Sequence, residues 1–178
     1  YGRPPTPPMR ASFLFCLLGA LLLSGCAHYR LGTSGELSFH TLYVAPVVNE
    51  NSNLPQAVAV VSTQLREAFL HDSRVILVNT PEEADATLTV RLVKYGRKST
   101  ARQANDTGLA RKFDITLDAK ATLVDNKDHK PLFTDRKVQA VRQIFTDNDQ
   151  QLQAEYQNVP LLAETLAKNV RSAALDIW

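Results

Sequence analysis

The chain has 178 residues, of which 44% are hydrophobic and 21% charged, and its formal net charge is +2. This composition excludes an intrinsically disordered chain, and seven glycines and nine prolines are too few for a collagen-like or low-complexity chain. Two cysteines are too few for a disulfide scaffold, and the length indicates one domain with room for a tail.

The first 25 residues have the pattern of an export leader. Residues 11–23 form an uncharged apolar run after Arg10, shorter than the roughly 20 residues of a membrane-spanning helix. Small residues and then Cys26 follow, which resembles the lipobox of bacterial lipoproteins. In that class the cysteine thiol receives a diacylglyceryl group, the leader is cut off before the cysteine, and the new amine is acylated. An ordinary secretory signal with a cysteine there by chance is the alternative. Met9, the only methionine, is the expected true start.

Lipidation at Cys26 would divide the chain into three parts. Residues 1–25 are then the leader, residues 26–40 a lipidated linker, and residues 41–178 one folded domain. Because Cys16 lies in the leader, the processed chain would have no thiol for a disulfide, a metal cluster or a nucleophile. We therefore expect no cofactor other than the covalent diacylglyceryl and N-acyl (palmitate-type) lipid.

Processing also changes the charge. The leader contains Arg3 and Arg10, so the processed chain has 18 basic and 18 acidic side chains and no net charge. Overall attraction to nucleic acid therefore has no support. Ala27 rather than aspartate follows the cysteine, which in this class of lipoprotein favours the outer membrane.

The first half of the domain alternates between strand and helix patterns. Residues 42–48 predict a strand with an edge or a bulge at Pro46, since proline lacks an amide donor. Residues 54–69 carry apolar side chains at steps of three and four, which predicts a helix with Asn53 as its N-cap. Residues 75–78 predict a short apolar strand.

Three long strands are predicted next. In residues 86–95 and 113–123 apolar and polar side chains alternate, as in half-buried strands. Residues 125–128 have the composition of a hairpin turn. Residues 132–145 return as a third strand, whose irregular alternation indicates either two partly covered faces or a bulge.

The last segment, residues 147–178, has a helical composition. We expect a first piece over residues 149–156, a break or kink at residues 158–160, and then the main helix with an apolar stripe. Together these elements predict an α+β domain in which two helices pack on one face of a mixed, mainly antiparallel four-stranded sheet.

Catalytic chemistry is not indicated. The sequence contains no motif of a serine hydrolase, zinc protease, phosphate-binding loop or dinucleotide-binding loop. The four histidines lack metal-ligand spacing, and Asp114 and Asp118 would lie about 13 Å apart along a strand, too far for glycosidase carboxylates. We therefore expect neither an enzyme nor a metal site.

Basic side chains are concentrated in one segment. Residues 91–112 contain seven basic residues and one acidic residue, whereas residues 147–164 contain four acidic residues and no lysine or arginine. Exposed strand ends carry such cations to discourage edge pairing, and this is one interpretation. The other is a site for phosphates or acidic headgroups. The candidate anion-binding residues are Arg97, Lys98, Arg102, Lys94 and Arg91.

The order of these features resembles the lipopolysaccharide-assembly (LptE-like) lipoprotein family. After the lipobox come Tyr29-Arg30-Leu31-Gly32, the segments V-A-P-V-V-N and Q-L-R-E-A-F, and Ala84-Asp85-Ala86 before a long strand. Residues 110–123 and 161–175 are similar to the family's central strand and C-terminal helix. The resemblance implies an outer-membrane lipoprotein that plugs a large β-barrel, helps it to assemble, and with it inserts lipopolysaccharide into the outer leaflet.

The resemblance also implies partners and contact residues. The partners are the β-barrel protein of the translocon, lipopolysaccharide, and the membrane that holds the lipid anchor. In this family lipopolysaccharide contacts are attributed to basic residues near the loop between the second and third long strands, where Arg102 is the nearest candidate, with Arg97 and Lys98 on the strand leading in. They are also attributed to the start of the last helix, where this chain has Glu155 and no base.

Two other functions stay open at this point. One is a periplasm-facing lipoprotein that activates a cell-wall synthase or forms part of a secretion pore. The other is an enzyme acting on envelope glycans.

Overall fold

The computed structural model describes residues 1–2, 37–99, 111–146 and 151–176. The chain divides into two compact units, Tyr1–Ser34 and Gly35–Trp178, and the second contains every helix and strand of the described residues. Cys26, nearly all of the expected leader and most of the expected linker lie outside the described residues. Lipidation at Cys26 therefore stays a prediction.

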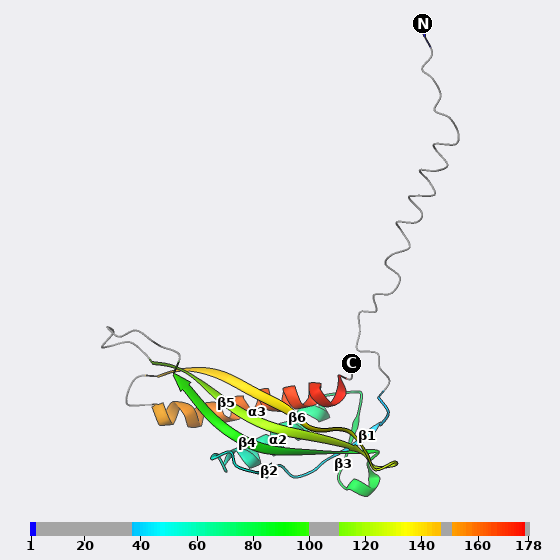
Figure 1. The fold of residues 1–178 in the computed structure, drawn as a ribbon, viewed down its shortest axis with the longest axis horizontal. Coiled ribbons are helices and arrows are strands. Elements are labelled where there is room, and N and C mark those ends of the chain that lie inside the picture. The colour runs from blue at the N-terminus through cyan, green and yellow to red at the C-terminus, as the bar shows by residue number, and fades with distance from the viewer. Residues whose placement is uncertain (3–36, 100–110, 147–150, 177–178) are drawn as a thin grey trace. The chain divides into compact units, whose positions relative to one another are not determined.

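One mixed sheet organises the second unit (Figure 1). Its strand order is β3-β1-β4-β5-β6, and β2 also pairs with β4. The pairs β1–β3, β1–β4 and β2–β4 are parallel, whereas β4–β5 and β5–β6 are antiparallel. The strands are β1 (Thr41–Val44), β2 (Val48–Asn49), β3 (Ile76–Val78), β4 (Ala86–Ser99), β5 (Arg111–Asp125) and β6 (Lys130–Thr146).

The α+β class with two helices on a mixed sheet is confirmed, but the four-stranded, mainly antiparallel sheet is wrong. One reason is that the strand predicted over residues 42–48 divides into β1 and β2 around Pro46. Proline has no amide proton and cannot continue a hydrogen-bonded ladder. The other reason is that β1 lies inside the sheet, between β3 and β4, and is parallel to both.

A carboxylate fixes the start of β1 beside the start of β4. Asp85 Oδ2 accepts hydrogen bonds from the amides of His40 and Thr41 at 2.9 and 3.0 Å, and Asp85 Oδ1 lies 2.9 Å from Lys127 Nζ. The Asp85 amide in turn donates to Thr41 Oγ1 at 2.8 Å. The Lys127 ammonium and then the two amides hold the pKa of Asp85 well below its usual range.

Helix α2 (Ala57–Leu70) lies where the apolar stripe predicts it, and Ala57, Val61, Leu65 and Phe69 are its buried residues. The predicted N-cap is wrong, because the residue before the helix is Gln56, which makes no side-chain capping bond. Asn53 instead has a positive φ of 55°. Asparagine adopts this left-handed conformation more readily than most residues, so Asn53 serves the turn ahead of the helix.

The three long strands confirm the predicted alternation. In β5 the alternate residues from Phe113 to Leu123 are all buried, while Asp114, Thr116 and Asp118 lie on the opposite face, which no helix of the described residues covers. The irregular third strand is explained by bulges, since the register with β5 shifts twice near Leu123. Asp135, in this bulged part of β6, has a positive φ of 50°.

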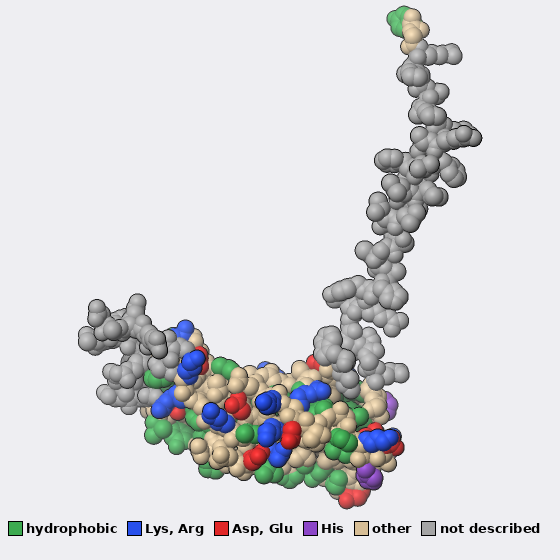
Figure 2. Space-filling view, viewed as in Figure 1, with side chains coloured by type: hydrophobic (Ala, Val, Ile, Leu, Met, Phe, Trp, Pro, Cys, Tyr) green, Lys and Arg blue, Asp and Glu red, His purple; other side chains and the backbone are tan. Residues whose placement is uncertain are grey.

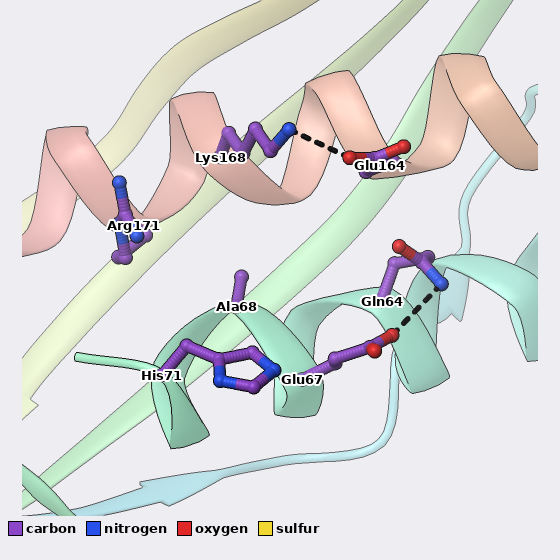
Figure 3. A pocket seen from close by; sticks show the side chains of 7 residues that line it. All are labelled: Gln64, Glu67, Ala68, His71, Glu164, Lys168 and Arg171. Atoms are coloured by element: carbon purple, nitrogen blue, oxygen red, sulfur yellow. Dashed lines mark hydrogen bonds and ion pairs between the residues drawn. The ribbon is translucent and has the colours of Figure 1, made fainter.

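Helix α3 (Gln151–Leu175) runs without a break through Pro160, so of the predicted break or kink the break is wrong. Val159 and Leu162, on either side of the proline, are both buried, and their packing stabilises the helix through this position. Pro160 itself is exposed, and the carbonyl that loses its donor there can be hydrated. Helices α2 and α3 lie side by side in front of the strands in Figure 3, so both cover the same face of the sheet.

Ion pairs join the C-terminal ends of the two helices. Arg74 donates from Nε and Nη2 to the two carboxylate oxygens of Asp72 at 2.9 and 2.8 Å, and from Nη1 to Asp176 at 2.9 Å. The hydrogen bond from Arg74 lowers the pKa of Asp72 despite the burial of that carboxyl. Asp72 and Arg74 follow α2, and Asp176 follows α3. The network therefore lies at the C-terminal end of α3, whereas the basic residues at the end of β4 lie near its N-terminal end.

Candidate functional site

A bulge in β4 divides the predicted basic residues between the two faces of the sheet. Leu92 pairs with Ala119 and Lys94 with Asp118, so Val93 is an extra residue with no partner in β5. Because side chains alternate along a strand, this insertion reverses which residues face the helices. Before the bulge Arg91 lies on the uncovered face. After it, Lys94 and Lys98 lie there, and Arg97 lies on the helix-covered face opposite buried Ile115.

Arg97 forms an ion pair with a buried carboxylate of α3. Its Nη1 lies 2.6 Å from Glu155 Oε1, and the hydroxyl of Tyr95 donates to Glu155 Oε2 at 3.0 Å. Glu155 is only 8% exposed. Burial, and then the hydrogen bond to Glu155, raises the pKa of Tyr95, and the same carboxylate raises the pKa of Arg97. The three side chains join the far end of β4 to the start of α3.

This arrangement bears directly on the anion-site prediction. A guanidinium whose charge is already balanced by a carboxylate at 2.6 Å attracts a further anion less strongly. Arg91 is in a similar position, because it lies 3.5 Å from Glu50 and forms a short ion pair with Asp135. Two of the five candidates are therefore held in ion pairs within the fold.

Lys94 and Lys98 differ from these arginines. Both are exposed, and the register places them across from Asp118 and Asp114 on β5. Those aspartates accept hydrogen bonds from Gln139 at 2.7 Å and Gln143 at 3.1 Å on β6. Within the described part of the chain, no carboxylate lies within ion-pair distance of Lys94 or Lys98. Lys94 and Lys98 thus lie on the same, uncovered face, about 13 Å apart along β4, and neither has an ion-pair partner among the described residues.

Figure 2 shows where these charges lie on one side of the molecule. Lys and Arg side chains are spread over this side, and some of them lie at the left end, where β4, β5 and β6 have their far ends in Figure 1. Lysine, arginine and acidic side chains are interspersed over the rest of the visible surface. Arg102, the remaining candidate, lies outside the described residues. The interpretation that these cations discourage edge pairing is also supported. Beyond the hydrogen bond from the Tyr95 amide to the Ser52 carbonyl oxygen, β4 pairs only with β5 among the described residues.

A hollow lies between the two helices (Figure 3). It has a volume of about 390 Å³. Lys168 is paired with Glu164 at 2.6 Å across one wall, and Gln64 donates to Glu67 at 3.1 Å across the other. Acidic and basic groups therefore balance one another there, and the hollow has no preference for an anion. The lining residues are Gln64, Glu67, Ala68, His71, Glu164, Lys168 and Arg171.

Sequence reasoning missed Glu155 and Tyr95 as partners of Arg97. The sequence did show a contrast between the basic residues 91–112 and the acidic residues 147–164. That contrast did not identify which arginine would pair with Glu155. No group of three or more His, Cys, Asp or Glu side chains within the described ranges is placed to hold a metal ion. Among the described helices, none is long and apolar enough to cross a membrane.

Comparison with known proteins gives one family. The model of the family LptE, described as lipopolysaccharide-assembly, matches residues 39–174. No curated protein matches the chain.

Solved structures with similar folds include several lipoproteins. A minor lipoprotein from Acinetobacter baumannii is 14% identical and covers 78% of this chain and 94% of its own, with a TM-score of 0.48. An uncharacterized lipoprotein B from Nitrosomonas europaea is 21% identical and covers 83% of this chain and 86% of its own, with a TM-score of 0.46. The rare lipoprotein B from Shewanella oneidensis is 13% identical and covers 76% and 94%, with a TM-score of 0.41.

Proposed function

The chain belongs to the LptE family of lipopolysaccharide-assembly proteins, and we propose that it is an outer-membrane lipoprotein that plugs a β-barrel translocon. In this role it helps the barrel to assemble, and the pair inserts lipopolysaccharide into the outer leaflet. The observation that carries the proposal is the family match, which extends from just before β1 almost to the end of α3. The family is one of non-enzymatic lipoproteins, which agrees with the lack of a catalytic motif in the sequence.

The two faces of the sheet support a plug. One face is buried under α2 and α3, so the fold does not need a partner to cover its core. On the other face Lys94, Lys98, Asp114 and Asp118 are charged and partly or fully exposed. The lumen of an outer-membrane barrel is polar, and a surface of mixed charge suits contact with such a wall.

The proposed lipid anchor would keep this domain beside its partner. Each buried methylene of an acyl chain contributes about 0.8 kcal/mol, and two or more chains give a lasting attachment to the membrane. The anchor would be the diacylglyceryl and N-acyl lipid of Cys26. Ala27 after it supports the outer membrane as the destination.

Lysine side chains are the best candidates for direct contact with lipopolysaccharide phosphates. Lys94 and Lys98 offer two ammonium groups on one face, without carboxylate partners in the described structure. Arg102 would add a third cation beyond the end of β4. Arg97 and Arg91 contribute less, because each is paired with a carboxylate of its own domain.

The partner can be tested by isolating the tagged full-length protein from outer membranes in a mild detergent. We expect a single large β-barrel protein in equal amount, identified by mass spectrometry and by its heat-dependent mobility on a gel. Recovery of a cell-wall synthase or a secretion-pore subunit instead would favour the alternative function. A protein recovered alone would contradict the plug.

Lipopolysaccharide contact can be tested by reversing charge at the two lysines. The double variant Lys94→Glu/Lys98→Glu should bind lipopolysaccharide at least about tenfold more weakly, since each charge-assisted contact contributes roughly 1.5 kcal/mol or more. Its barrel complex should survive. The matched control, Lys130→Glu/Lys137→Glu, changes two exposed lysines of β6 by the same charge and should bind normally. An equal loss of lipopolysaccharide binding in both double variants would favour the other interpretation, in which Lys94 and Lys98 only discourage edge pairing.

A further inference from the structure

The outer strand β6 is protected against edge pairing over only half of its length. Its first half contains Pro131, two register shifts and Asp135 at a φ of 50°, all of which interrupt a regular ladder. From Arg136 to Thr146 the register with β5 is continuous. Unprotected edges of this kind accept a further strand, because their outer backbone groups are unpaired.

Helix α3 covers only the middle of this edge. Asn169 donates from its side chain to the carbonyl oxygen of Gln139 at 2.8 Å, so that carbonyl points away from β5. Alternate residues of a strand direct their backbone groups to the same side, and Val141, Gln143 and Phe145 therefore also point outward. Within the described residues, nothing hydrogen-bonds to the outward backbone groups of these three.

On the uncovered face, the side chains of this half of β6 itself are apolar or uncharged, and the nearest cation is Lys112 of β5, whose Nζ lies 5.8 Å from the centre of the Phe145 ring. Val141 is 49% exposed and Phe145 is 65% exposed, and Gln143 lies between them on the same face. This differs from the guarded edges of most sheets, which carry charged side chains facing outward. Arg142 lies on the other face and is held by Asn158 Oδ1 at 2.8 Å.

We propose that residues 141–145 of β6 pair in antiparallel fashion with the same residues of a second copy of this chain. With Gln143 opposite its own copy, Val141 lies across from Phe145, which is a favourable aromatic and β-branched pair. In this register Arg142 lies across from Ile144, so no like charges face each other. The segment is therefore complementary to itself.

A closed barrel cannot be the occupant of this edge. All of the strands of a closed barrel are paired with one another, and none offers a free edge. The self-pairing is thus separate from the proposed plug, and it concerns the pool of protein that has not yet met its partner. Isolating the tagged protein together with a β-barrel therefore neither supports nor contradicts the self-pairing.

Charged substitutions at Gln143, which faces its own copy at the centre of the proposed strand pair, give the sharpest test. The purified full-length protein in mild detergent should form a dimer as its concentration rises in analytical ultracentrifugation. Gln143→Lys and Gln143→Glu each place like charges against each other, and each should weaken the dimer at least tenfold. Mixing the two variants should restore the dimer, because lysine then faces glutamate. Gln143 is exposed, but its side chain donates to Asp114 at 3.1 Å, so the melting temperature of each variant is compared with that of the parent to separate a folding defect from a weaker dimer.

The control is the same pair of changes at Thr134, an exposed residue in the bulged half of β6. Thr134→Lys and Thr134→Glu should leave the dimer unchanged. Amide hydrogen exchange supplies a second readout, since exchange at Val141, Gln143 and Phe145 should slow as the dimer forms. A single-copy mass at every concentration would overturn the proposal. So would a mixture of the Gln143 variants that stays monomeric, or amide protection that needs an added partner protein.

Discussion

Glu155 is expected to act as a structural clamp between α3 and β4, and its replacement by alanine tests this role. The change leaves Tyr95 Oη and Arg97 Nη1 without the oxygens that now lie 3.0 and 2.6 Å away. Hydrogen bonds to charged groups contribute about 1.5–3 kcal/mol each when protected from water. Arg97 is 49% exposed, so solvent screens its share, and we expect a total loss of about 1–2 kcal/mol.

This loss should lower the melting temperature by about 3–6 °C for a domain of this size, measured by differential scanning calorimetry. The matched control is Glu164→Ala in the same helix, whose ion pair with Lys168 is exposed and should contribute nothing measurable. A double-mutant cycle that combines Glu155→Ala with Arg97→Ala isolates the coupling free energy between these two side chains. Equal melting temperatures for Glu155→Ala and Glu164→Ala would refute the clamp.

The same variant separates structure from ligand binding. Glu155→Ala removes the carboxylate that balances Arg97, so lipopolysaccharide affinity should stay the same or rise. A fall in affinity without unfolding would mean that Glu155 contributes to the ligand site itself.

Two further changes test the packing and the acid sensitivity of the domain. Leu166→Ala should lower the free energy of unfolding by about 2–5 kcal/mol in urea titrations, because Leu166 is fully buried between the helices and the sheet, whereas Leu161→Ala, at a position 40% exposed, should cost far less. Asp85 has a folded-state pKa below its unfolded value of 3.8, so its carboxylate stabilises the fold above about pH 4, and this contribution is lost as the pH falls through the folded-state pKa. Asp85→Asn should therefore be less stable than the parent at pH 7 by about 1 kcal/mol, and the gap should narrow on acidification. A gap that stays constant from pH 7 to pH 2 would show that the charge of Asp85 is not the cause.

Local periodicity predicted most of the elements. The alternation over residues 113–123 reflects the two-residue period of a half-buried strand, which β5 shows throughout. The apolar steps of α2 and the second part of α3 likewise follow from the helical period. Long-range pairing was not available from these patterns, so the place of β1 between two parallel neighbours was missed.

The candidate site was harder to predict than the fold. A single extra residue, Val93, decides which face each later side chain of β4 occupies, and the alternation alone does not reveal it. As a result Arg97 turns toward α3, where it meets Glu155, 58 residues later in the chain. Pro160 was overestimated as a breaker, because the burial of Val159 and Leu162 outweighs the lost hydrogen bond.

Depletion of the protein from cells tests the central proposal most directly. If the chain plugs and helps to assemble a lipopolysaccharide translocon, then the folded barrel and newly made lipopolysaccharide at the cell surface should fall together as the protein disappears. Surface labelling of lipopolysaccharide and the heat-dependent mobility of the barrel measure the two quantities. Normal surface lipopolysaccharide after full depletion would contradict the proposed role.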